Sequence, residues 1–487
     1  MRIAKVWLFL PLFLVAMTSA QDSAHQIVTE ALKPSPLETN LRRLTDEIGG
    51  RVPGTAAMRK AVDWGVAAFK AAGADSVHTE DFTIQASWAE GFTRMSIVAP
   101  EAFDVRVVSV AWAPALAAHQ DVPIIDVGDG KAEDFVTAGN VAGAILLVHS
   151  HEMAKWEDLF AEYLRAPGII NRALQGRALA IAFQSSRPHD LLYRHTDTSQ
   201  GEIDRIPMVQ VAREDAARMA RLLASGQKLH ADLAIPNRIG GPITAANVVA
   251  ELRGNEKRDE FVILGAHLDS WELGTGALDN GCNAALVIDA LRTIKTAGVR
   301  PRRSIRFILF SGEEEGLLGS HAYAIAHRSE LDKAAGVIIF DGGTGQVSGF
   351  SVGGRKDVAE AATSLVAPLK QFDAAKLTTD AEWGTDNWDF MLEGVPTFVA
   401  NQEEANYLIN YHAMSDTFDK VDLAQLKKHV AEAAALAFGI ANAPQRLGPR
   451  LHHAQIEQTM RETHLDELMK TFGVWQQWQD GKWGRAD

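Results

Sequence analysis

Residues 261–270 read FVILGAHLDS, a run of six apolar or small residues followed by a histidine, a leucine and an aspartate. Two later stretches repeat this pattern: Ile305–Phe310 precedes SGEEEG, and Val337–Phe340 precedes Asp341. Nearly continuous apolar runs of this length are typical of strands that are buried on both faces, as in a parallel sheet. The three runs therefore predict the core of an α/β fold in which polar side chains follow the strands directly.

Helical patterns separate these runs. Leu286, Leu291 and Ile294 fall on one face of a helix that follows residue 281, and another helix is expected from about residue 424 to 441. Alternating strands and helices predict a three-layer α/β sandwich with a mostly parallel central sheet. Further strands are expected at Ser76–Ile84, Val248–Leu252 and Thr397–Ala400.

The pattern of expected secondary structure changes between residues 105 and 240, where short β runs surround a helix at 213–223. This change predicts an inserted, β-rich module. The chain then divides into a discontinuous catalytic domain, an insert and a C-terminal tail: residues 21–104 with 241–443, residues 105–240, and residues 444–487. The tail is expected to contain one amphipathic helix from Gln455 to Phe472.

The first twenty residues are typical of a secretory signal peptide. Arg2 and Lys5 precede an apolar run, and Thr18–Ala20 offers small residues for cleavage. The apolar run is shorter than the roughly 20 residues that span a bilayer. We therefore expect an exported protein, periplasmic or secreted, with no stable membrane insertion after cleavage. The single cysteine, Cys282, excludes an intramolecular disulfide and favours a periplasm over a disulfide-rich extracellular setting.

Composition narrows the classes of partner. The chain of 487 residues is 47% hydrophobic and 23% charged, as in ordinary globular proteins. Its formal net charge of −14 argues against nucleic acid as a partner, because phosphate binding needs clustered lysines and arginines.

Candidate functional residues follow the predicted strands. His267, the glutamates Glu313 and Glu314, and Asp341 come directly after three of them. Because ligands of open α/β sheets bind beyond the carboxyl ends of the strands, we expect these side chains to lie close together. Each also has an ordinary interpretation as a turn residue or as an acidic residue in the first turn of a helix.

Three further residues can complete the site. Asp279 lies in a glycine-rich loop, where it can also serve as a helix N-cap, and His412 lies in a loop without apolar periodicity. Asp269 is two residues beyond His267, so an extended backbone places both side chains on one side. A metal-bound imidazole usually donates its other N–H to a carboxylate or a carbonyl, and Asp269 could accept it.

Two histidines and several carboxylates without a thiolate suit a hydrolytic zinc site with open positions. One carboxylate, that of Asp279, can bridge two cations through its two oxygens. Adjacent glutamates point in different directions, so one can bind metal while its neighbour acts as a general base on water. Two metal ions can therefore share Asp279 and a water molecule.

With these residues identified, the sequence resembles the co-catalytic two-zinc aminopeptidase family of clan MH. The resemblance runs from about residue 27 to 443, and Ser270-Trp271 favours the branch of the plasma glutamate carboxypeptidases. It rests on the following motifs: GAHLDSW (265–271), GALDNG (276–281), GEEEGLLGS (312–320), GTD (384–386) and His412 with Asp416-Thr417.

The resemblance implies two metal sites that share one ligand: His267, Asp279 and Asp341 for the first zinc ion, and Asp279, Glu314 and His412 for the second. It also implies that Glu313 is the general base and that Asp269 orients His267. A cis peptide bond between Asp279 and Asn280 and a protease-associated domain at residues 105–240 belong to the same resemblance, which leaves a homodimer open.

The expected function is hydrolysis of the N-terminal bond of small peptides by a zinc exopeptidase, either an aminopeptidase or a dipeptidase. Two alternatives are a glutaminyl cyclase on a related fold and an inactive, receptor-like homologue. The inserted module favours the peptidase, and the filled ligand positions disfavour an inactive site. The side-chain preference of the enzyme stays open.

Overall fold

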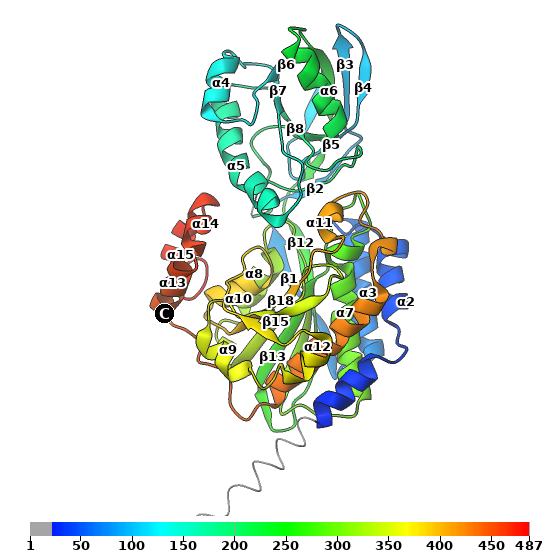
Figure 1. The fold of residues 1–487 in the computed structure, drawn as a ribbon, viewed down its shortest axis with the longest axis vertical. Helices are drawn as coiled ribbons and strands as arrows, with labels where there is room; N and C mark the ends of the chain where they lie inside the picture. The colour runs from blue at the N-terminus through cyan, green and yellow to red at the C-terminus, as the bar shows by residue number, and fades with distance from the viewer. Residues whose placement is uncertain (1–21, 199, 487) are drawn as a thin grey trace, which may run out of the picture.

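The computed structural model of the protein describes residues 22–198 and 200–486 (Figure 1). The predicted signal peptide, residues 1–20, lies outside them. Within the described chain, no helix combines the length and the apolar character needed to cross a membrane. Two eight-stranded sheets form two bodies, one above the other in Figure 1. A short ladder of β2 (Ser87–Ala89) and β11 (Arg238–Gly240) lies where the chain passes between them.

The first sheet contains the strands that the site motifs follow, β13, β14 and β15. Its order is β1-β12-β14-β13-β15-β18-β16-β17. The bounds, in that order, are Ser76–Ile84, Ile243–Leu252, Arg303–Phe310, Lys257–His267, Ala334–Ile339, Thr397–Gln402, Val347–Ser351 and Lys376–Thr378. The central strands β14, β13, β15 and β18 are parallel, whereas β1 with β12, β12 with β14, and β16 with β18 pair antiparallel. The expected α/β sandwich is confirmed, and its sheet is mixed toward both edges.

Helices cover both faces of this sheet (Figure 1). On one face α2 (Leu37–Arg42), α3 (Ala56–Ala72), α7 (Cys282–Thr296), α9 (Lys356–Ala362) and α12 (Leu423–Asn442) share one apolar core with the strands. On the other face lie α8 (Leu318–Ala326) and α10 (Asn387–Leu392). The sequence sets the helix ends: Thr55 accepts a hydrogen bond from the Met58 N–H, and Gly73, at φ 91°, ends α3.

The second sheet has the order β4-β3-β10-β6-β7-β8-β9-β5. The bounds, in that order, are Phe103–Val105, Arg94–Ala99, His230–Ile235, Leu116–Asp126, Ile145–Val148, Ala180–Gln184, Met208–Val211 and Val107–Ser109. Its helices are α4 (Ala132–Ala138), α5 (Trp156–Gln175) and α6 (Arg213–Ala224). Along the chain the second sheet begins with β3, at residue 94, whereas the boundary was predicted at residue 105. Sequence reasoning missed β3, because this strand is half-exposed and carries no distinctive apolar run. The identity of this body as a protease-associated domain stays a prediction.

The C-terminal tail forms three short helices, α13 (His453–Glu462), α14 (Leu465–Thr471) and α15 (Trp475–Gln479). The single helix predicted from Gln455 to Phe472 is wrong, because the helix is interrupted after Glu462 and His464, whose φ is 60°, precedes a second helix. This break lets both helices contribute to one apolar cluster that also contains Trp388 of α10. Trp483 donates its indole N–H to Asp389 at 2.6 Å, so the tail is fixed to α10.

Glu432 lies buried on α12, and it offers a test of how this helix packs in the core of the first body. Neither of its carboxyl oxygens has a hydrogen-bond partner among the residues that the structure describes, and burial raises its pKa from 4.5 to about 8. Because the folded-state pKa is raised, the stabilisation from binding this proton is complete below pH 4.5 and is lost as the pH rises through 8. We expect Glu432→Gln to increase the free energy of unfolding by about 2–4 kcal/mol at pH 9 and to change it little at pH 5, measured by urea denaturation.

The matched control is Glu360→Gln on α9, which removes an exposed carboxylate. It should leave the free energy of unfolding nearly unchanged at both pH values. An equal effect of Glu432→Gln at pH 5 and pH 9 would contradict the assignment of a raised pKa to this group.

Candidate active site

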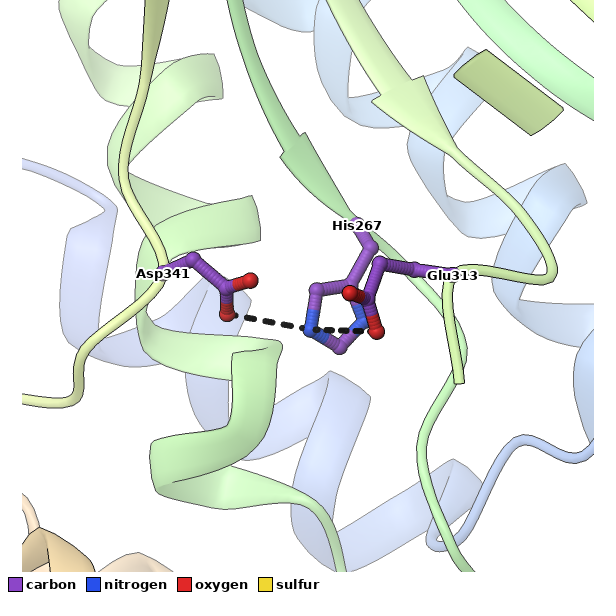
Figure 2. A group of neighbouring side chains, drawn as sticks. All are labelled: His267, Glu313 and Asp341. Carbon is purple, nitrogen blue, oxygen red and sulfur yellow. Dashed lines mark hydrogen bonds and ion pairs between the residues drawn. The ribbon is translucent and has the colours of Figure 1, made fainter. Parts of the chain in front are cut away.

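The structure brings together the side chains that were predicted to bind metal or to act as the base: His267, Asp279, Glu313, Glu314, Asp341 and His412. His267 ends β13, the two glutamates lie in the loop after β14, and Asp341 follows β15. Figure 2 shows the side chains of His267, Glu313 and Asp341 converging from these three segments. Because the central strands are parallel, their C-terminal ends lie at the same edge of the sheet, and the site lies at that edge.

His267 occupies the centre of this group. Its Nε2 lies 3.1 Å from Asp279 Oδ1, 3.2 Å from Asp341 Oδ1 and 3.9 Å from Glu313 Oε2. The other ring nitrogen, Nδ1, lies 3.1 Å from the main-chain carbonyl of Asp269. A proton on Nδ1 that is donated to this carbonyl leaves the Nε2 lone pair directed at the space between the carboxylates.

Asp279 stands between the two histidines. Its Oδ1 faces His267, while its Oδ2 lies 3.4 Å from His412 Nε2. The same His412 nitrogen is 2.7 Å from Glu314 Oε2. One carboxylate thus presents one oxygen to each histidine, which is the arrangement that a bridging ligand requires.

Two sets of three donor atoms are close enough to surround a cation, with all atoms of a set within 4.8 Å of one another. They belong to His267, Glu313 and Asp341, and to His267, Asp279 and Glu314. This grouping places Glu313 among the possible ligands, although it was predicted as the base. The side chains of Glu313 and Asp341 are 11% and 10% exposed, against 1% for His267, so the site opens on their side.

Asp269 contacts His267 through its main-chain carbonyl, whereas a contact through its carboxylate was predicted. Its carboxylate oxygen Oδ1 lies 3.8 Å from His267 Nδ1, which is too far for a hydrogen bond, and its carbonyl takes that place. Its Oδ2 instead accepts a hydrogen bond of 3.1 Å from the Glu314 N–H. Asp269 therefore links His267 to the glutamate loop through two different groups.

The turn that carries Asp279, residues Ala277–Gly281, is held by a carboxylate that the sequence did not single out as a site residue. Asp416 accepts hydrogen bonds from the main-chain N–H groups of Ala277, Leu278 and Asp279 at 3.1, 2.7 and 3.1 Å. The expected cis peptide bond between Asp279 and Asn280 is present in this turn. The signal for Asp416 was its place in the motif that follows His412.

Arg51 fixes the loop before this turn. Its fully buried guanidinium donates to the carbonyl oxygens of Leu268, Thr275 and Gly276 at 2.5, 2.8 and 2.9 Å. Sequence reasoning missed this residue, because an arginine in a turn gives no sign of burial. Its charge lies among carboxylates that would otherwise have few positive neighbours.

Buried carboxyl groups dominate the electrostatics. Burial and neighbouring carboxylates raise the pKa of Glu313 and Glu314 well above 4.5, and burial lowers the pKa of His412 to about 3. Burial opposes charge on His267, but the fields of Asp341 and Glu313 outweigh it and raise the pKa of the imidazole. A cluster of this kind needs bound protons or cations to compensate its charge.

Several buried oxygens at the site lack a hydrogen-bond partner among the residues that the structure describes. They belong to the carboxyl groups of Asp269, Asp279, Glu314, Glu315 and Asp386. Glu315 and Asp386 were not predicted as site residues, although they lie in the motifs GEEEGLLGS and GTD. Unpaired oxygens beside two imidazole nitrogens are a suitable donor set for divalent cations such as zinc.

Comparisons with known proteins show that the chain is similar to peptidases. Residues 247–437 match the model of Peptidase family M28. Carboxypeptidase Q of Mus musculus is 25% identical over 409 residues, covering 83% of this chain and 85% of the relative. Carboxypeptidase Q of Homo sapiens is 24% identical over 439 residues, covering 88% and 91%.

Solved structures are similar across most of the chain. The structure of a Peptidase M28 precursor from Shewanella amazonensis SB2B matches with a TM-score of 0.81 at 27% identity, covering 89% of this chain and 99% of that one. The zinc aminopeptidase BSAP from Bacillus subtilis matches in fold, with a TM-score of 0.65 at 20% identity over 85% and 98% of the two chains.

The fold and the acidic site together define a zinc metallopeptidase, a hydrolase that acts on peptides. Residues 247–437, the part of the chain that carries the site residues, belong to peptidase family M28.

Arg51 provides a test of how the site is held. Arg51→Met removes four hydrogen bonds to the carbonyl oxygens of Gly49, Leu268, Thr275 and Gly276 and one buried positive charge, so we expect the free energy of unfolding to fall by about 3 kcal/mol or more. The measurement is urea denaturation of the metal-free protein. Arg59→Met is the matched control, because Arg59 is exposed and donates one bond to the Gly54 carbonyl. Equal, small effects of the two substitutions would contradict the role given to Arg51.

Proposed function

We propose that the protein is an exported two-zinc exopeptidase that hydrolyses the N-terminal bond of small peptides. One observation carries the proposal: the two carboxylate oxygens of Asp279 face different histidines, His267 and His412. In this assignment His267, Asp279 and Asp341 hold one ion, and Asp279, Glu314 and His412 hold the other. The buried oxygens without partners on Asp279 and Glu314 support the fit.

Bound zinc supplies acidification of a water molecule and polarisation of the scissile carbonyl. The residues of the chain do the rest. Glu313 lies at the more exposed side of the site, with its carboxylate near His267 but outside the ligand set that we assign. There it takes a proton from the attacking water and returns it to the leaving amine, as a general base and then a general acid. Asp269 holds the tautomer of His267 through its carbonyl group.

Charge and the relatives guide the choice of substrate. The site is rich in carboxyl groups, and a site of this kind favours a free α-ammonium group on the substrate. The relatives at 24–25% identity are named carboxypeptidase Q. In a dipeptide the N-terminal and the C-terminal bond are the same bond, so dipeptides satisfy both indications. The basic and apolar start of the sequence supports export to the periplasm or the exterior.

The role of Glu313 is tested with Glu313→Gln, which keeps the size of the side chain but removes its basicity. We expect kcat to fall by about 10³-fold or more while zinc binding is retained, because the general base is lost and the assigned ligands are not. Hydrolysis of dipeptides by the zinc-loaded enzyme is the measurement. Glu47→Gln, at an exposed position, is the control and should leave kcat unchanged. Nearly normal turnover by Glu313→Gln would remove Glu313 from the base role.

Metal dependence and substrate class are tested together. We expect dialysis against a chelator to abolish hydrolysis and two equivalents of zinc per chain to restore it. The panel contains free dipeptides, aminoacyl anilides, dipeptides with an acylated N-terminus and peptides that begin with glutamine. Cleavage of only the acylated peptides would overturn the exopeptidase assignment at the N-terminus. Cyclisation of the glutaminyl peptides without hydrolysis would indicate the cyclase instead.

A further inference from the structure

The loop that carries His412 is held by a segment of the other body. Residues 187–194, between β8 and β9 of the second sheet, run beside residues 411–414, and we call them the latch segment. The Arg194 N–H donates to the His412 carbonyl at 3.0 Å, and the Met414 N–H donates to the Leu192 carbonyl at 3.0 Å. Tyr193 and Ala413 form an antiparallel bridge between these two bonds. The backbone of His412 and of the two residues that follow it is thus paired with the latch segment.

Two arginine side chains reinforce this pairing. Arg187 is fully buried and donates through Nη2 to the Tyr411 carbonyl at 3.1 Å and through Nη1 to Ser186 Oγ at 2.6 Å. Arg194, also buried, contacts Glu272 at 3.3 Å in the loop that follows His267. Because each guanidinium has a fixed planar geometry, each fixes the position of the latch segment relative to the first body.

His412 needs such support. Its φ of 58° lies in the left-handed region, which non-glycine residues seldom adopt and which persists only where the surroundings impose it. The residue lies outside helix and strand, between α11 (Tyr407–Asn410) and α12. Its ring packs on Tyr411 at 3.6 Å and against the edge of Trp271 at 6.0 Å between ring centroids, but these contacts do not fix the carbonyl.

We propose that the latch segment positions His412 for metal binding, with Arg187 as a positioning residue that acts through the Tyr411 carbonyl. The inference rests on the proposed function, in which His412 holds one of the two ions. It makes the second body a structural part of the metal site. An outer residue that orients a metal ligand typically contributes a factor of about 10–100 in metal affinity.

The test uses the full-length, metal-free protein titrated with zinc and, in parallel, with cobalt. We expect Arg187→Met to lower the affinity for one of the two ions by about 10–100-fold and to leave the affinity for the other unchanged. Raising the zinc concentration should restore kcat, because the catalytic residues are intact. Arg213→Met is the matched control: Arg213 also donates to main-chain carbonyls, those of Ser150 and Ser185, but within the second body. It should leave the affinity of both ions unchanged.

His412→Ala separates failure of this inference from failure of the proposed function. If His412→Ala keeps both ions at their original affinity, His412 is not a ligand and the proposed function fails. If His412→Ala loses one ion while Arg187→Met binds both normally, the latch inference alone is wrong. Should Arg187→Met not fold, Arg187→Lys decides, because lysine keeps the charge but cannot bond Tyr411 and Ser186 together in the same planar geometry. Normal affinity for both ions in a folded Arg187→Lys would then overturn the inference.

Discussion

Carboxyl groups are concentrated at one buried edge of the first sheet, and the neighbouring structure must compensate their charge. Carboxylates repel one another and lose hydration when they are buried, so their position has to be fixed by groups that are themselves fixed. Asp416 is satisfied by main-chain N–H groups, and Arg51 brings a positive charge while binding the carbonyl oxygens of the adjacent loop. The unpaired oxygen of Asp279 lies 3.4 Å from His412 Nε2, so the same buried negative charge that needs compensation is a source of affinity for cations.

The centre of the sheet and the residues at its carboxyl edge could be predicted from the sequence because both follow from local pattern. Apolar runs identify β13, β14 and β15, and the polar residues after them must share an edge if these strands are parallel. Arg51 could not be found this way, since its burial depends on a loop more than two hundred residues away. The break at His464 was missed for a similar reason, because the helical periodicity continues on both sides of it and only packing against α10 shows the turn.

Segments outside residues 247–437, the part that matches the family model, hold the loops inside it. Arg51 comes from the N-terminal part of the first body, and the latch segment comes from the second body. The tail adds a third support through Trp483 and Asp389. The site residues come from the matched part, but their geometry depends on contacts with the rest of the chain.

The pairing of β1 with β12 has a consequence for synthesis. β1 pairs along its whole length with β12, from Ser76 opposite Glu251 to Ile84 opposite Ile243, and the entire second sheet is encoded between them. A nascent chain therefore exposes β1 without a partner until translation has passed the second body. Contacts so distant in sequence form slowly, and unpaired strands associate readily with other chains. Within the second body β3 pairs with β10, so its two ends lie side by side, and folding of this body before β12 pairs shortens the search of β12 for β1.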